Sequence, residues 1–169
     1  MKRTLAAGLA FALCAACGGG QEGGLPPEPL RKLDEARAFE IILAAFQEMD
    51  VRAEQGRPLA TQAAGNFDVD LAIPGKPVAL EYLDDRDRSA LSAALPSRRG
   101  DTLRIMAAAD ATSGAEVQVL IVEDRDYEYD PNPEQSGGGR APTVLAIEGR
   151  LRRDVIDFLQ YAKTEGLCD

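Results

Sequence analysis

Hydrophobic residues recur with helical spacing in two segments, one early and one late in the chain. Residues 30–51 and 148–164 each place apolar side chains three, four or seven positions apart, as one face of an amphipathic helix requires. These side chains are Leu33, Phe39, Ile42, Leu43, Phe46 and Met49 in the first segment, and Leu151, Val155, Phe158, Leu159 and Ala162 in the second. We predict a helix over each segment. Gly56 and Pro58 are expected to stop the first one, and residues 144–147 fit either a short strand or the start of the second.

Between these helices, the apolar pattern changes to alternation. Residues 67–73 and 77–83 alternate apolar and polar side chains on either side of Pro74-Gly75, which predicts a β-hairpin. An even-numbered loop would place Leu71 opposite Val78, and the same register makes every further pair on that face apolar. The polar face of the hairpin would then carry the carboxylates of Asp68, Asp70 and Glu81.

The remaining segments complete a small mixed domain. A short helix is expected from the capping residues Asp84 and Asp85 to about Leu95, whereas residues 101–109 fit either helix or strand. Residues 117–122 (VQVLIV) predict a central strand that is buried on both faces. Residues 123–130 fit an exposed extension of it, and residues 131–142 a long loop. The expected fold is one α+β domain over residues 30–169, with a mixed sheet of about three to five strands and about three helices.

The first residues suggest export rather than folding. Lys2 and Arg3 precede an apolar run over residues 4–16, which is shorter than the ~20 residues that span a bilayer and suits a secretory signal. At Ala15, Ala16 and Cys17 the chain resembles the lipobox of bacterial lipoproteins, although Cys14 stands where that family commonly has leucine. The resemblance implies a signal peptide over residues 1–16, cleavage before Cys17, and attachment of acyl chains such as palmitate to Cys17. A plain secretory signal that releases a soluble protein is the alternative.

Residues 17–29 are rich in glycine and proline, which predicts a tether between the acylated Cys17 and the domain. Two further segments, residues 33–42 and 149–166, look like those of a group of uncharacterised bacterial proteins with a first amphipathic helix, a hairpin and a closing helix. That resemblance implies one domain and carries no activity with it.

Composition and charge narrow the candidate functions. The chain has 28 acidic and 19 basic residues, no histidine and 3 cysteines, with a net charge of −9. The absence of histidine excludes Ser-His-Asp and Cys-His catalysis as well as histidine-ligated zinc. The acidic balance argues against nucleic acid as a partner, so membrane contact is expected through the acylated Cys17. Cys168, close to the C-terminus, is expected to be exposed.

Two groups of acidic residues are candidate cation sites. Asp68, Asp70 and Glu81 offer the oxygen ligands that Mg²⁺ and Ca²⁺ take, but the solvated face of a half-buried hairpin would look the same. The second group alternates along the chain and consists of Asp124, Asp126, Glu128 and Asp130. Its spacing suits Ca²⁺, yet it lacks the glycine and glutamate of an EF-hand loop; an acidic strand extension is the alternative. The interleaved Tyr127 and Tyr129 would then lie on the core or bind a partner.

Together these features predict an exported protein, lipid-anchored in the cell envelope on the periplasmic or outer-membrane side, or else secreted. The missing catalytic groups favour a non-enzymatic binding or structural module, with an envelope protein as a possible partner and no cofactor. The alternative is a divalent-cation-binding protein or a metal-dependent enzyme that uses Ca²⁺ or Mg²⁺ at the acidic hairpin face or the acidic loop.

Overall fold

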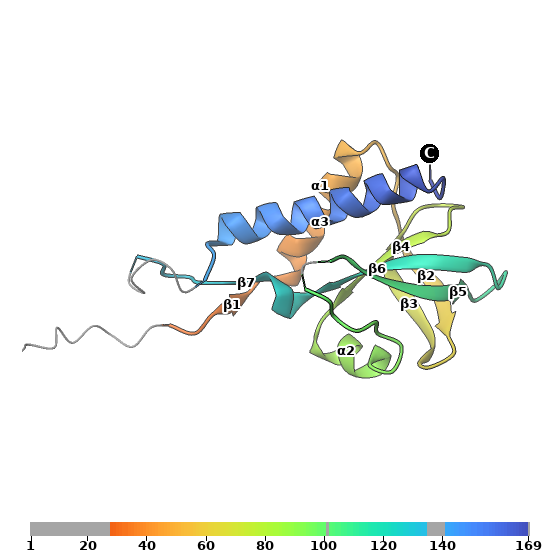
Figure 1. The fold of residues 1–169 in the computed structure, drawn as a ribbon, viewed down its shortest axis with the longest axis horizontal. Helices are drawn as coiled ribbons and strands as arrows, with labels where there is room; N and C mark the ends of the chain where they lie inside the picture. Colours follow the sequence, from red (N-terminus) through yellow and green to blue (C-terminus); the bar gives the residue numbers. More distant parts are fainter. Residues whose placement is uncertain (1–27, 101, 135–140, 169) are drawn as a thin grey trace, which may run out of the picture.

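The computed structural model describes residues 28–100, 102–134 and 141–168. Its elements in chain order are β1 (Arg31–Lys32), α1 (Glu35–Glu48), β2 (Glu54–Thr61), β3 (Gly65–Ala72), β4 (Val78–Leu83), α2 (Asp85–Leu91), β5 (Arg104–Asp110), β6 (Glu116–Glu123), the 3₁₀ helix η1 (Asp124–Tyr127), β7 (Glu128–Tyr129) and α3 (Val144–Thr164). Figure 1 shows α1 and α3 on one side of the sheet and α2 on the other. The predicted α+β class is confirmed.

The strands β2, β3, β4, β6 and β5 close into a barrel in that order. Its neighbouring strands are antiparallel except β4 and β6, which run parallel. Closure depends on β2 and β5, where Leu59 pairs with Asp110 and Ala60 with Ala109. A five-stranded Greek-key barrel with a helix between its third and fourth strands has the architecture of an OB-type barrel.

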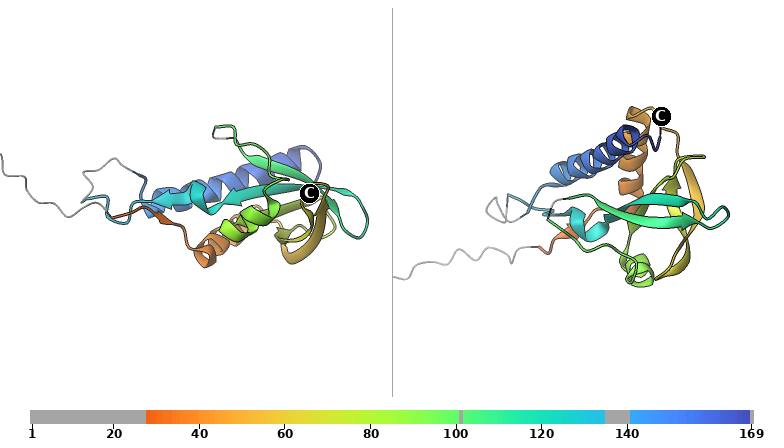
Figure 2. Two further views of the ribbon diagram at one scale, coloured as in Figure 1. Left: turned by 90° about the horizontal axis from the view of Figure 1, so that it is seen from below. Right: turned by 45° about the vertical axis from the view of Figure 1, so that its right-hand side comes forward.

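The sheet is buried on both faces, which gives the domain two apolar cores. The barrel interior is filled by side chains from all five strands and by Leu91 of α2, so this helix covers one end of the barrel. The second core lies between the outer face of the sheet and the helices α1 and α3, which Figure 2 shows from two further directions. Strand β6 serves both cores, because Val119 and Ile121 face the interior while Leu120 and Val122 face the helices. The predicted central strand with two buried faces is therefore confirmed.

The first helix is shorter than its apolar pattern predicted. Asp34 caps α1 by accepting a hydrogen bond from the backbone of Arg37, and Arg31–Lys32 forms a short strand with β7 instead of helix. The helix ends at Met49, and Asp50 adopts a positive φ of 55°. The early end is explained by the barrel, because the chain must reverse here to enter β2.

Strand β2 was not predicted at all. It contains Gly56 and Pro58, which are residues that usually mark the end of regular structure. Gly56 adopts a φ of +74°, a conformation that glycine reaches without steric cost. The carbonyl of Pro58 accepts from the backbone N–H of Ala111 at 3.1 Å, so the backbone of residue 58 faces β5 at the point where that ladder ends. The missing N–H therefore removes no bond between β2 and β3.

The hairpin is confirmed, but its predicted register is wrong by two residues. Leu71 pairs with Leu80 rather than with Val78, because the loop holds four residues instead of two. The backbone N–H of Ile73 donates to the carbonyl of Val78 at 3.0 Å and closes this longer loop. As a consequence, the residue opposite Glu81 on the neighbouring strand is Asp70, whereas the predicted register placed Asp68 there.

Most of the remaining segments follow one of the predicted alternatives. The ambiguous stretch 101–109 contributes a strand, β5, and residues 144–147 begin α3. The expected extension of β6 is instead the turn of η1 followed by β7, and Cys168 is buried at 4% exposure rather than exposed. The predicted signal and most of the predicted tether lie outside the described residues, as do residues 135–140 of the long loop. No helix in the described ranges has the length and apolar character needed to cross a membrane.

Truncating Phe158 tests the core between sheet and helices. Its side chain is fully buried at 0% exposure, so Phe158→Ala should lower the free energy of unfolding by ~3–5 kcal/mol. Urea unfolding of the chain from residue 17, with Cys17→Ala to keep it soluble, measures this change. Leu145→Ala, at a side chain that is 75% exposed, is the control and should stay within about 0.5 kcal/mol of the parent. Equal losses in the two variants would contradict this description of the core.

Candidate functional site

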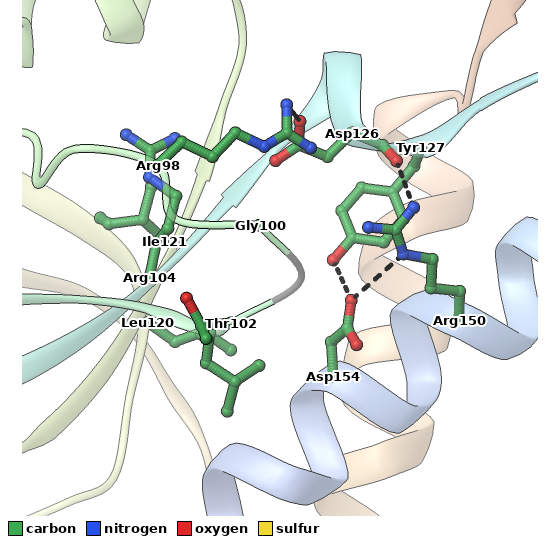
Figure 3. A pocket seen from close by; sticks show the side chains of 11 residues that line it. Arg98, Gly100, Thr102, Arg104, Leu120, Ile121, Asp126, Tyr127, Arg150 and Asp154 are labelled. Carbon is green, nitrogen blue, oxygen red and sulfur yellow. Dashed lines mark hydrogen bonds and ion pairs between the residues drawn. The ribbon is translucent and has the colours of Figure 1, made fainter.

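A small cavity of about 40 Å³ lies where β5, β6, η1 and α3 meet. Figure 3 shows Arg150 beside Tyr127 and Asp154 and the guanidinium of Arg98 beside Asp126, whereas the side chain of Arg104 extends away from these groups. We name this cavity the arginine pocket, and its polar side chains are Arg98, Arg104, Asp126, Tyr127, Arg150 and Asp154.

The α3 side of the pocket is a connected network. Tyr127 donates its hydroxyl hydrogen to Asp154 Oδ2 at 2.7 Å. Arg150, one helical turn from Asp154, lies with its guanidinium 5.7 Å from the centre of the Tyr127 ring and donates to the carbonyl of Asp126 at 3.4 Å. Burial, and then the charge of Asp154, raises the pKa of Tyr127, so its phenol stays protonated and remains a donor.

The barrel side of the pocket holds the other two arginines. Arg98, in the connection between α2 and β5, pairs with Asp126 at 2.6 Å. Arg104, the first residue of β5, pairs with Glu123 and donates to the carbonyl of Pro96 at 2.9 Å. The Nε of Arg104 is buried and has no hydrogen-bond partner in the described structure, so this guanidinium retains one unused donor.

Cations neutralise most of the acidic run that was predicted as a Ca²⁺ loop. Asp124 binds Lys32 at 2.8 Å and Arg88 at 2.5 Å. Burial alone would raise the pKa of Asp124, but these two cations outweigh burial and lower it. Asp126 pairs with Arg98, although burial still raises its pKa above the ordinary value.

Glu128 and Asp130 are the remaining acidic residues of the predicted Ca²⁺ loop. Glu128 is paired in register with Lys32 across β1 and β7. Asp130 is buried at 5% exposure, and its Oδ1 accepts a hydrogen bond from the backbone of Asn132 at 2.8 Å. Over the described residues, no group of three or more cysteines and carboxylates is placed to hold a metal ion.

The hairpin carboxylates do form a pair, at a place where two strands separate. Beyond the Leu71–Leu80 pair, the ladder between β3 and β4 ends, and side chains replace backbone acceptors. Glu81 Oε2 accepts from the backbone N–H of Asp70 at 3.1 Å, and Asp70 Oδ2 accepts from the backbone N–H of Tyr82 at 2.7 Å. Asp68 stays exposed. The structure thus unites two of the three predicted residues in an acid pair.

The acid pair favours protonated carboxyl groups. Glu81 is only 4% exposed, and burial together with the charge of Asp70 raises its pKa to about 8. Burial likewise raises the pKa of Asp70 to about 6. At neutral pH Glu81 is therefore protonated, which removes the repulsion between two neighbouring ionised carboxylates.

The two tyrosines that were predicted to lie on the core or to bind a partner have different surroundings. Tyr127 is buried at 4% exposure and forms a wall of the arginine pocket. Tyr129 is half-buried in β7, opposite Arg31 of β1. Sequence reasoning missed the arginine pocket because Arg150 is far along the chain from Arg98 and Arg104, and no local spacing signals that they meet.

No family model matches the chain, and neither the curated proteins nor the solved structures contain a match. The barrel topology offers one point of reference. In OB-type barrels the face of the second and third strands binds oligonucleotides and oligosaccharides. Here that face belongs to β3 and β4, and its Leu71, Leu80 and Tyr82 pack in the core beneath α1 and α3.

The acid pair makes stability depend on pH. A pKa raised in the folded state contributes stability that is complete below the ordinary pKa and is lost as pH rises through the folded value. The free energy of unfolding should therefore fall between pH 5.5 and 8.5, by at least about 1.4 kcal/mol, which corresponds to one pKa unit. Glu81→Gln keeps the shape of the neutral acid and should flatten this slope.

Urea titrations at a series of pH values measure both slopes. Glu116→Gln replaces an exposed glutamate of β6 and is the matched control, which should keep the slope of the parent protein. A Glu81→Gln protein with an unchanged slope would show that Glu81 does not carry the proton.

Proposed function

We propose that this chain is an exported bacterial envelope protein, anchored by acyl chains on Cys17, whose domain is a non-enzymatic binding module. Three features support the proposal: the lipobox-like residues before Cys17, the glycine- and proline-rich residues 17–29, and the arginine pocket of the domain. The lack of histidine removes the commonest general base from any catalytic assignment.

The anchor rests on the order of features along the chain. A basic start, an apolar run and small residues lead to Cys17, and the first described strand begins at Arg31. Two or more acyl chains hold a protein firmly at a membrane, whereas one chain binds only marginally. The domain therefore needs no basic face to stay at the membrane, which agrees with the net charge of −9.

The single observation that carries the binding role is that three arginines line one small pocket of an acidic protein. Guanidinium groups match carboxylates and phosphates with paired donors and are weakly hydrated, which suits a small anionic ligand. We therefore assign the pocket to a small anion or to the carboxylate of an envelope partner. The pocket walls are held by Tyr127 and Asp154, so the donors are positioned before a ligand arrives.

A divalent cation is the second candidate, and the acid pair is the feature that bears on it. Ca²⁺ takes six to eight oxygen ligands. Asp70 and Glu81 already accept backbone hydrogen bonds, and their raised pKa values favour a proton over a metal. We keep the absence of a cofactor as part of the proposal for these reasons.

The anchor is tested by expressing the full chain in a bacterial host beside Cys17→Ala. The parent protein should fractionate with membranes and should carry the mass of acyl chains on residue 17, because the thiol of Cys17 is the acceptor. Cys17→Ala should lose both properties. Intact-mass spectrometry and membrane fractionation read the outcome. A soluble exported protein with an unmodified Cys17 would make it a secreted protein instead.

The pocket is tested by measuring melting temperature in phosphate, sulfate and citrate at constant ionic strength. An anion that binds the folded state stabilises it by RT ln(1 + c/Kd), where c is the concentration of the anion. The parent protein should therefore gain several degrees that chloride does not give. Arg150→Gln and Arg98→Gln should each lose most of this gain, because each removes one guanidinium from the cavity.

Arg153→Gln is the matched control, since Arg153 lies on α3 near Arg150 but is exposed and does not line the pocket. It should keep the full stabilisation by anions. The same stabilisation in all variants would place anion binding outside the arginine pocket, and no stabilisation in the parent protein would remove the pocket from the proposed function.

A further inference from the structure

Large apolar side chains that remain exposed are concentrated at one end of the described domain. Leu30 is 43% exposed, Val144 is 37% exposed and Leu145 is 75% exposed. Only Tyr161, in the later half of α3, joins them among the described large hydrophobic residues. A cluster of large apolar side chains stays exposed where another apolar phase covers it.

The fold brings these three residues to the same end. Leu30 precedes β1, in which Arg31 pairs with Tyr129 of β7. The next residue, Asp130, donates its backbone N–H to the carbonyl of Pro142 at 3.0 Å, directly before α3 begins. The views in Figures 1 and 2 agree that β1 and the first turn of α3 lie at one end of the molecule, away from the barrel. We name this part the apolar end, formed by Leu30, Val144 and Leu145.

The position of Cys17 indicates that a membrane covers the apolar end. Leu30 is thirteen residues beyond Cys17, so even a fully extended chain spans at most about 47 Å at ~3.6 Å per residue. An anchor at Cys17 therefore restrains the apolar end more closely to the bilayer than any other part of the domain. We infer that Leu30, Val144 and Leu145 rest in the surface of the membrane that holds the acylated Cys17, which sets the orientation of the domain. This inference rests on the proposed anchor.

Charge at this end agrees with an apolar rather than an electrostatic contact. Arg31 pairs with Glu28 beside Leu30. Beside Leu145, Arg37 pairs with Glu40 and Glu148, and Arg152 pairs with Glu48, so these cations are already neutralised. Attraction to anionic lipid needs unpaired basic residues. The contact should therefore form on zwitterionic lipid and should be insensitive to salt. The barrel would then project away from the bilayer.

The experiment places a fluorescent label on the acylated full-length protein in phosphatidylcholine vesicles whose acyl chains carry bromine, a short-range quencher. One protein carries the label at Leu145→Cys, and the control carries it at Ser113→Cys, in the exposed turn after β5. Cys17 is acylated in this protein and Cys168 is buried, so the unsubstituted protein controls for background labelling. Quenching at residue 145 should exceed that at residue 113 several-fold, with and without added salt.

A second variant separates the apolar side chains from the reach of the chain. Leu30→Gln with Val144→Gln, both at exposed positions, should reduce quenching of the label at residue 145 by at least half while the protein stays on the vesicles. Unchanged quenching would overturn the role of these side chains.

Two other outcomes overturn the inference in distinguishable ways. Equal quenching at residues 145 and 113 in a protein of full acyl mass rejects the apolar end and leaves the anchor intact. A protein without acyl mass that does not bind the vesicles rejects the anchor itself. A shielded label at residue 145 without bromine quenching, together with cross-linked pairs, would assign the apolar end to a second copy of the chain and would also reject the inference.

Discussion

The packing of β6 on both of its faces is the constraint on which the rest of this structure depends. Val119 and Ile121 fill the barrel, while Leu120 and Val122 support α1 and α3. The same strand pairs with β4 on one side and β5 on the other. Because one strand is shared by two cores, the barrel and the helix layer are coupled. Loss of either core would expose the apolar side chains on one face of β6.

The end of β6 also determines where charge collects. Glu123, Asp124 and Asp126 follow the buried strand and would be costly there without partners. Arg88, Arg98 and Arg104 supply those partners, and the last two of them also line the arginine pocket. The pocket is thus a consequence of neutralising buried acids. Its donors are available for a ligand because each guanidinium has more N–H groups than one carboxylate can use.

The charge of the acid pair is neutralised in a different way. Between β3 and β4, Asp70 and Glu81 receive backbone hydrogen bonds and no cation, and raised pKa values follow from burial. A proton therefore does the neutralising that Arg98, Arg104 and Lys32 do elsewhere. The contrast explains why similar runs of acidic residues in one sequence lead to two different local structures.

The sequence by itself determined the two amphipathic helices, the hairpin and the buried central strand, because each depends on periodicity within a few neighbouring residues. It also located the capping Asp84 before α2. Only the tertiary structure decided the rest. Strand β2 exists in spite of Gly56 and Pro58 because barrel closure needs it, and the hairpin register follows from a loop length that alternation leaves open. The meeting of Arg98 with Arg150 depends on residues distant in sequence, which no local pattern encodes.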